Sequence, residues 1–207
     1  MVIGIDFDNT IVCYDDVFRR AALELKLIPD SFSGGKRQIR DHLRGGDREP
    51  EWTRLQGHVY GVSIADAQPF PGILEALRTL RQRRIGVYIV SHRTRRPLLG
   101  DAHDLHLAAD AWLETHGFYE APLTGLSRER VFFEPTVRSK LRRIHSTACT
   151  HFVDDLPEFL LDPEFPAGVD RILFDPAGTE RTPRGLCRAA SWAEVSALLH
   201  PAAPASS

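Results

Sequence analysis

Short apolar runs alternate along the chain with longer segments in which apolar residues recur every three or four positions. The short runs are rich in Val, Ile, Phe and Tyr, a composition typical of strands that are buried on both faces. They lie at residues 2–6, 85–90, 130–133, 150–153 and 171–174. Because strands alternate with helical patterns, the sequence predicts an α/β fold with a Rossmann-like parallel sheet flanked by helices.

The longer segments have the spacing of amphipathic helices. In residues 72–83, for example, Leu74, Leu77 and Leu80 fall on one stripe, and Pro71 can open the helix. Similar patterns predict helices at residues 105–116 and 135–144.

The interval between the first two predicted strands is too long for a single crossover helix. It contains three further helical patterns, at residues 14–26, 36–44 and 51–60. We therefore expect residues 14–68 to form an inserted helical cap, and residues 1–13 and 69–200 to form the Rossmann-like core. Residues 201–207 are rich in Ala, Pro and Ser, and we expect them to be a disordered tail.

Composition narrows the possible environments and partners. The 207 residues carry a formal net charge of -2, which argues against a dedicated binder of nucleic acid or of a membrane surface. No apolar stretch approaches the ~20 residues of a membrane span, and the N-terminus enters a strand without a basic leader. The three cysteines have no metal-ligand spacing, and their odd number argues against a disulfide framework. We expect a cytoplasmic protein.

Chemically capable side chains follow the predicted strands. Open α/β sheets bind ligands at the carboxyl ends of their strands, so these residues should meet at one rim. The set comprises Asp6, Asp8 and Thr10 after the first strand, Ser91, His92 and Arg93 after the second, Lys140 on the helix after the third, and Asp154 and Asp155 after the fourth.

These residue types suit phosphoryl transfer. An aspartate such as Asp6 can act as the nucleophile, and Asp8 can serve as general acid and base if the chain leaves the strand at Phe7. Carboxylates from two strands, Asp6 and Asp154, make a hard oxygen site suited to Mg²⁺. A serine hydroxyl and a lysine ammonium can hold and neutralise the phosphoryl group.

Each residue alone has a common structural explanation. The motif from Asp6 to Thr10 can form a turn, and Ser91 can cap a helix. Lys140 can be a solvated helix residue, and the Asp154–Asp155 pair can stabilise a helix N-terminus. Their joint order and placement favour a shared site.

At these residues the sequence resembles the haloacid dehalogenase-like superfamily of hydrolases. The resemblance covers Asp6-Phe7-Asp8-Asn9-Thr10 and about residues 69–174, and it does not extend to a recognisable type of cap. It implies a nucleophile at Asp6 and an acid/base at Asp8. Mg²⁺ would be held by Asp6, the backbone carbonyl of Asp8, and Asp154, with Asp155 joining through water.

The resemblance also implies a phosphoryl site and a type of reaction. Thr10, Ser91, His92 and Lys140 are the expected phosphate-binding residues. Dehalogenase members lack an acid at the position of Asp8, so a phosphatase or phosphomutase is favoured. The expected partner is a small phosphate ester, such as a sugar phosphate or nucleotide.

Two other functions stay open at the level of sequence. A polynucleotide end phosphatase could use the basic residues of the cap, although a solvated helix face explains them as well. A non-enzymatic phospho-receiver module uses similar residues, but in another chain order. Arg37, Arg40 and Arg93 are the predicted substrate contacts.

Overall fold

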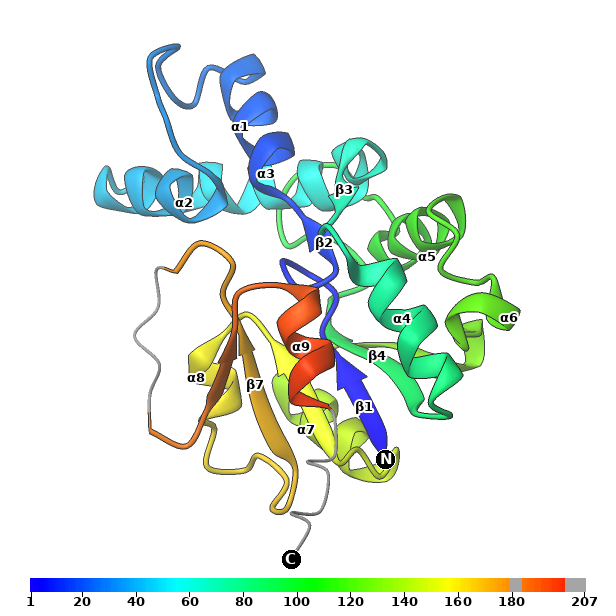
Figure 1. The fold of residues 1–207 in the computed structure, drawn as a ribbon. Helices are drawn as coiled ribbons and strands as arrows, with labels where there is room; N and C mark the ends of the chain where they lie inside the picture. The colour runs from blue at the N-terminus through cyan, green and yellow to red at the C-terminus, as the bar shows by residue number, and fades with distance from the viewer. Residues whose placement is uncertain (179–183, 200–207) are drawn as a thin grey trace, which may run out of the picture.

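A computed structural model describes residues 1–178 and 184–199 of the chain (Figure 1). The predicted disordered tail, residues 201–207, and a small part of the predicted core lie outside these residues. The strands are β1 (Val2–Ile5), β2 (Val12–Cys13), β3 (Gln68–Pro69), β4 (Gly86–His92), β5 (Val131–Glu134), β6 (His151–Asp154), β7 (Asp170–Phe174) and β8 (Cys187–Ala189).

Helices connect most of these strands. The α-helices are α1 (Asp15–Glu24), α2 (Lys36–Gly45), α3 (Glu49–Gly61), α4 (Ile73–Gln82), α5 (Leu105–Thr115), α6 (Ala121–Thr124), α7 (Val137–Ser146), α8 (Pro157–Leu160) and α9 (Trp192–Leu198). Two short 3-10 helices are η1 (Ser63–Asp66) and η2 (Arg128–Arg130). The six predicted helices are confirmed, with ends that differ by one or two residues.

Six parallel strands form the main sheet in the order β5-β4-β1-β6-β7-β8, which confirms the predicted α/β fold. The chain first adds strands on one side of β1 and then on the other, so the order of the strands reverses at β1. Such a reversal opens a crevice at the carboxyl ends of the central strands. The ends of β1, β4 and β6 therefore lie next to one another.

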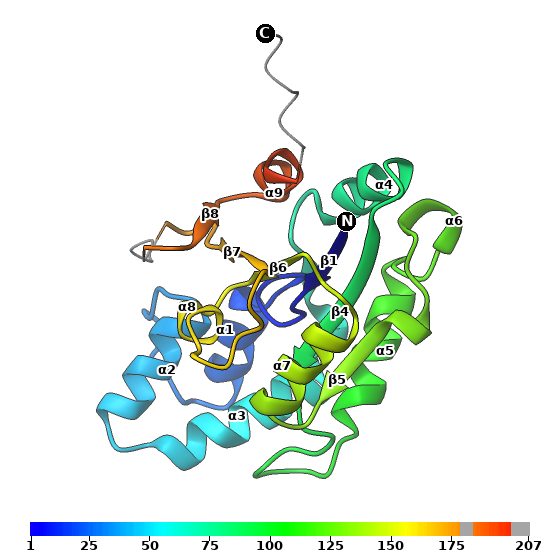
Figure 2. The same ribbon diagram turned by 90° about the horizontal axis from the view of Figure 1, so that it is seen from below.

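Two hydrophobic clusters pack against the two faces of the sheet. The larger cluster contains Ile3 and Ile5 of β1 and residues of α4, α5 and α9, whereas the smaller contains residues of α7 and α8. Figure 2 shows α4 and α9 on one face of the sheet and α7 and α8 on the other. Because successive strand residues point to opposite faces, the apolar runs of the sequence serve both clusters.

A glycine in the middle of β1 allows close packing on the second face. A Cβ at Gly4 would lie 2.5 Å from the Phe152 ring and 2.9 Å from the Cys149 sulfur. Phe152 is fully buried in the smaller cluster. Gly4 therefore lets the Phe152 ring and the Cys149 sulfur pack directly on the central strand, which carries the acidic motif at its end.

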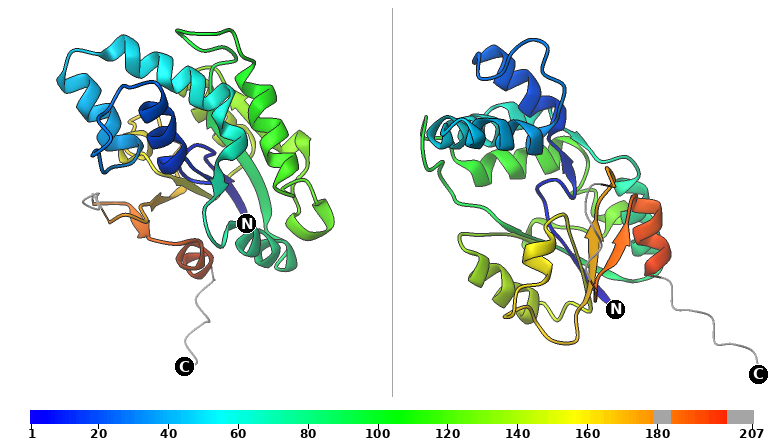
Figure 3. Two further views of the ribbon diagram at one scale, coloured as in Figure 1. Left: turned by 90° about the horizontal axis from the view of Figure 1, so that it is seen from above. Right: turned by 90° about the vertical axis from the view of Figure 1, so that its left-hand side faces the viewer.

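Helices α1, α2 and α3 occupy the interval between β2 and β3, and they pack on one another. They lie beyond the carboxyl ends of the strands (Figures 1 and 3). The short antiparallel pair β2–β3 joins this segment to the sheet, with Val12 opposite Pro69 and Cys13 opposite Gln68. This pairing was not predicted, because two-residue strands leave no periodic pattern.

Candidate active site

The acidic motif begins where β1 ends. The N–H groups of Ile11 and Val12 both donate to the Phe7 carbonyl, at 3.0 and 3.1 Å. The chain thus leaves the sheet and turns back within a few residues. As a result, the side chains of Asp6 and Asp8 line the same cavity, although alternation along a regular strand predicts only that both share a face of the sheet.

Lys140 joins the ends of two strands. Its ammonium donates to Asp6 Oδ1 at 2.6 Å and to Asp154 Oδ2 at 2.7 Å. All three side chains are at least nine-tenths buried, and the ammonium also lies 4.1 Å from the centre of the Phe159 ring. Three residues from distant parts of the sequence therefore form one charge-assisted cluster.

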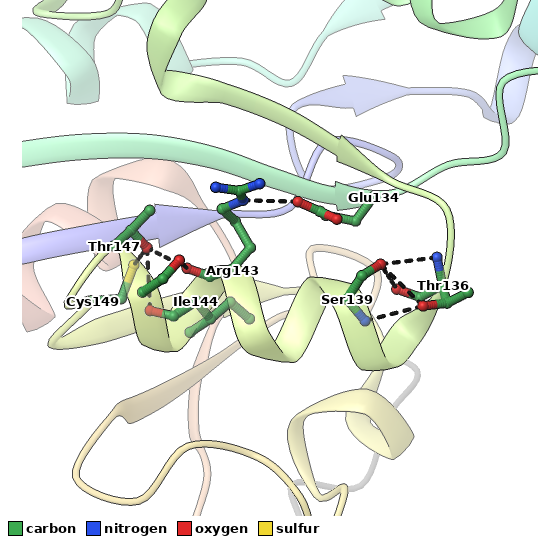
Figure 4. A network of polar contacts seen from close by, with 8 residues as sticks. Glu134, Thr136, Ser139, Arg143, Ile144, Thr147 and Cys149 are labelled. Carbon is green, nitrogen blue, oxygen red and sulfur yellow. Dashed lines mark hydrogen bonds and ion pairs between the residues drawn. The ribbon is translucent and has the colours of Figure 1, made fainter.

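The local structure of α7 holds Lys140 in place. The Thr136 hydroxyl accepts from the Ser139 N–H at 3.0 Å, and the Ser139 hydroxyl accepts from the Thr136 N–H at 3.2 Å. This reciprocal pair fixes the first turn of the helix (Figure 4). Further along, Arg143 Nε donates to Glu134 Oε1 at the end of β5, at 2.8 Å. Lys140 lies between the capped first turn and Arg143, so both contacts fix the part of α7 that carries it.

Three carboxylates provide a candidate metal site. Oxygen atoms of Asp6, Asp154 and Asp155 lie within 4.8 Å of one another. Asp154 is also oriented by the Leu156 N–H at 2.9 Å, and Asn9 Nδ2 donates to Asp155 at 3.3 Å. A set of oxygen ligands alone suits a hard divalent cation such as Mg²⁺.

Burial disfavours the charged forms of two of these carboxylates. Burial raises the pKa of Asp154 to about 7, even though the Lys140 ammonium opposes this shift. Burial and the neighbouring Asp154 raise the pKa of Asp155 well above its usual value. The single ammonium of Lys140 does not balance three carboxylates, so a divalent cation fits the charge as well as the chemistry of the donors.

Ser91 extends the cluster at the end of β4. Its side chain is 1% exposed and lines the cavity, and its hydroxyl has no hydrogen-bond partner among the described residues. A buried hydroxyl without a partner is costly, so a bound ligand is an appropriate acceptor for it.

The structure places the other two predicted phosphate ligands differently. His92 is exposed and lines the cavity next to Ser91. Thr10 is fully buried and is not among the residues that line the cavity. Its carbonyl accepts from Trp192 Nε1 at 3.1 Å, which fixes the acidic loop to α9. The Thr10 hydroxyl, like that of Ser91, has no hydrogen-bond partner among the described residues, and its role in phosphate binding stays a prediction.

Arg93 contacts Asp8 within the protein. Its Nη2 donates to Asp8 Oδ1 at 2.5 Å and to the Tyr14 hydroxyl at 3.0 Å. The guanidinium lies over the rings of Phe7 and Tyr60, at 5.3 and 4.9 Å, and is almost fully buried. Sequence analysis predicted that Arg93 contacts an anionic substrate, whereas the structure pairs its charge with the carboxylate of Asp8.

The cavity has a volume of about 670 Å³, a size suited to a small molecule. Its wall opposite the acidic cluster comes from the segment between β2 and β3, and it includes the two predicted substrate contacts Arg37 and Arg40. Lys36 and Tyr60 line the same wall. At the level of sequence, Lys36 was one of the basic residues of this segment that a polynucleotide end phosphatase could use, and Tyr60 was an aromatic residue among them that could stack bases. No role was predicted for Tyr14.

Comparisons with known proteins agree on the fold. No protein-family model matches the sequence, and no curated protein matches it significantly. Solved structures do match: the haloacid dehalogenase-like hydrolase YfnB from Bacillus subtilis, bound to magnesium, has a TM-score of 0.59 and 14% identity over 97% of this chain and 98% of its own.

Two further structures support the same assignment. A haloacid dehalogenase-like family hydrolase from Xanthomonas campestris has a TM-score of 0.57 and 12% identity, over 96% of this chain and 93% of its own. A hydrolase of this superfamily from Deinococcus radiodurans, with bound phosphate and sodium, has a TM-score of 0.55 and 16% identity over 97% and 98%. The chain therefore has the fold of the haloacid dehalogenase-like hydrolases.

Proposed function

We propose that this protein is a Mg²⁺-dependent phosphohydrolase that cleaves a small phosphate ester through a phospho-aspartate on Asp6. The observation that carries the proposal is the Lys140 ammonium, which bridges Asp6 and Asp154 in the cavity that also contains the unpartnered Ser91 hydroxyl. The cluster combines a nucleophile, a cation and a hydrogen-bond donor, which are the groups that phosphoryl transfer needs.

In the first half of the reaction, a carboxylate oxygen of Asp6 attacks the phosphorus atom and the ester P–O bond breaks. Asp8 donates a proton to the leaving oxygen, so that an alcohol departs. The Ser91 hydroxyl and the Lys140 ammonium hold oxygens of the transferring group. Lys140 already contacts Asp6, so the nucleophile and this stabilising charge are preorganised.

In the second half, the Asp8 carboxylate takes a proton from water, and the resulting oxygen attacks the phosphorus of the phospho-aspartate. The bond between Asp6 and phosphorus breaks, which releases inorganic phosphate and restores the Asp6 carboxylate. Arg93 keeps Asp8 in the cavity through a hydrogen bond at 2.5 Å. Asp8 thereby returns to the protonated state that the next cycle requires.

Asp6, Asp154 and Asp155 are the residues that would hold Mg²⁺, and the resemblance adds the backbone carbonyl of Asp8. When bound, the ion supplies positive charge that offsets the charge on the phosphoryl oxygens. The solved structure from B. subtilis contains magnesium, and the one from D. radiodurans contains phosphate. Both support the proposal that the site binds Mg²⁺ and a phosphoryl group.

The alternatives are less compatible with the cavity. A phospho-receiver has no use for a general acid such as Asp8, and a dehalogenase lacks an acid at this position in the family pattern. A cavity of about 670 Å³ favours a small ester over a polynucleotide end. A phosphomutase would use the same residues, and transfer of the phosphoryl group to a second alcohol instead of water would identify it.

We propose that residues 14–68 act as a cap over this site, and that the protein works in the cytoplasm on a soluble substrate. In the described residues, no helix is long and apolar enough to cross a membrane. A cap limits access of bulk water to the reacting group, and its residues can select the leaving group.

A screen of phosphate esters with the purified protein and Mg²⁺ tests the proposed function. We expect phosphate release that stops with excess chelator and returns with Mg²⁺, while Ca²⁺ supports it poorly because its coordination is looser. The Asp6→Asn variant is the control for contaminating phosphatases. Full activity in excess chelator would contradict the role of the metal.

A further inference from the structure

The cap helix α2 presents a row of cations to the cavity. Lys36, Arg40 and Arg44 are spaced by four residues, so they share one face of the helix, and all three line the cavity. The opposite wall carries the carboxylates of Asp6 and Asp155. A molecule that spans the cavity therefore meets positive charge on the side of the cap.

The positive charges of these three side chains are balanced to different extents by nearby carboxylates. Arg44 makes two hydrogen bonds to Glu49, at 2.6 and 2.9 Å, so its charge is balanced. Arg40 contacts Asp41, its neighbour in sequence, at 3.0 Å, and both side chains are partly exposed. None of the described carboxylates forms an ion pair with Lys36. Among the described residues, Lys36 is therefore the cation of this row that interacts with the Tyr60 side chain but forms no ion pair with a carboxylate.

Aromatic rings hold the Lys36 ammonium in the cavity. It lies 5.6, 5.7 and 5.5 Å from the ring centres of Tyr14, Phe18 and Tyr60. Ring faces attract a cation without neutralising it. The backbone is fixed as well, since the Lys36 N–H donates to Asp15 at 2.9 Å, and a Cβ at Gly35 would collide with that carboxylate.

Lys36 and Asp8 line the same cavity. Burial alone would lower its pKa, but Tyr60, Asp155 and Asp8 together raise it above the usual value, so the side chain stays charged. Asp8 is the group that protonates the leaving oxygen in the proposed reaction. A leaving group protonated by Asp8 lies in the cavity that Lys36 and, one helical turn further, Arg40 also line.

We propose that Lys36 and Arg40 form a subsite for a second anionic group, so that the substrates are phosphate esters whose leaving group carries another phosphate or a carboxylate. This inference rests on the proposed function, because it takes the scissile phosphate to lie at Asp6. Its chemistry is separate from that of Ser91 and Lys140, which hold the phosphate that is cleaved.

The test compares matched esters of increasing chain length: alkanediol bisphosphates, alkyl phosphates that end in a carboxylate, and neutral alkyl monophosphates. Binding to the Asp6→Asn variant with Mg²⁺ is measured by calorimetry, and kcat/KM is measured with the wild-type protein. At its best length, at least one doubly anionic series should bind about 10- to 100-fold more tightly than the neutral series. The series that does so identifies the second group as phosphate or carboxylate.

The Lys36→Met exchange, made in the Asp6→Asn protein, should remove most of this preference, and Arg40→Gln should remove part of it. Methionine keeps an unbranched stem against the aromatic rings, so the cap can retain its packing. The matched controls are Lys26→Met and Arg54→Gln, which remove exposed cap charges outside the cavity. They should leave the preference intact.

The outcomes separate this inference from the proposed function. Equal binding of all three series would overturn the subsite, even if monophosphates were hydrolysed. An equal loss of all three series in Lys36→Met would also overturn it, since Lys36 would then bind the scissile phosphate. A preference for doubly anionic esters without any phosphate release would support the subsite and contradict the proposed hydrolysis.

Discussion

Arg93 Nη2 donates to Asp8 Oδ1 at 2.5 Å, and the guanidinium side chain is only 2% exposed. The same nitrogen donates to the Tyr14 hydroxyl at 3.0 Å, at the start of α1. A residue at the end of β4 therefore connects the proposed acid/base with the first residue of the cap. This connection lets the position of the cap influence that of Asp8.

Arg93→Lys should lower kcat by about 10²-fold with little change in KM, because a single ammonium cannot replace both Nη2, which donates to Asp8 and Tyr14, and Nη1, which donates to the Leu105 carbonyl. Steady-state kinetics on the best substrate measures kcat and KM separately. The control is Arg95→Lys, since Arg95 is exposed and pairs with Asp104 away from the cluster. A rise in KM alone would show that Arg93 binds substrate, as the sequence suggested.

Lys140→Ala should lower kcat by about 10²–10³-fold, equivalent to roughly 2.7–4 kcal/mol, because it removes the charge preorganised beside the nucleophile. Arg142→Ala on the exposed side of α7 is the matched control and should have little effect. Circular dichroism of both variants checks the fold. A folded Lys140→Ala variant with normal kcat would remove Lys140 from the mechanism.

Stabilisation by Mg²⁺ should depend on pH. In the metal-free protein, burial raises the pKa of Asp154 from 3.8 to about 7, so the folded state binds a proton more tightly than the unfolded chain. The contribution of Asp154 to the free energy of unfolding therefore falls as pH rises through this interval. A bound cation replaces the proton, so its stabilising effect grows over the same interval.

Thermal unfolding in Mg²⁺ and in chelator, at a series of pH values, measures this effect. The increase in Tm caused by Mg²⁺ should be larger near pH 8 than near pH 5, on either side of the pKa of about 7. Asp154→Asn should reduce both the increase and its pH dependence. An increase in Tm that is the same at all pH values would contradict a metal site at Asp154.

Gly4→Ala should reduce the free energy of unfolding by about 1–3 kcal/mol, because the added methyl group overlaps the Phe152 ring in a packed core. Gly86→Ala in the neighbouring strand is the control, since its nearest neighbour would be Val2 Cγ2 at an ordinary 3.5 Å. Urea unfolding of both variants gives the comparison. Equal stability of the two variants would show that the Phe152 and Cys149 side chains can shift to accommodate the methyl group.

The sequence predicted the elements that have strong local patterns. The five apolar strands and the six amphipathic helices are present, because burial on a sheet face or along a helix stripe leaves a period that can be read locally. Strand β8 was missed, since its three residues, Cys187 to Ala189, contain Arg188 and form no apolar run. The helices α6, α8 and α9 were also missed, because such short helices do not repeat the helical spacing of apolar residues often enough to be recognised.

The candidate site was predictable only in part. Asp6, Ser91 and Asp154 lie at the carboxyl ends of three adjacent parallel strands, so the strand order brings them together. The contact of Lys140 with Asp6 and Asp154 depends in addition on how α7 packs. The ion pair between Arg93 and Asp8 joins residues that are 85 positions apart, and no local pattern reports it. The placement of Lys36 over aromatic rings likewise depends on how α1, α2 and α3 pack.

The central claim is that Asp6 carries the phosphoryl group during turnover. Its most direct test is rapid acid quenching of the reaction with Mg²⁺ and the best ester from the screen, followed by peptide mass spectrometry. With an aryl phosphate, whose leaving group needs little protonation, Asp8→Asn should slow hydrolysis of the intermediate more than its formation and make it easier to trap. We expect one added phosphoryl group on Asp6, and none in the Asp6→Asn variant. Wild-type rates of phosphate release from Asp6→Asn, or a phosphoryl group on another residue, would contradict the account.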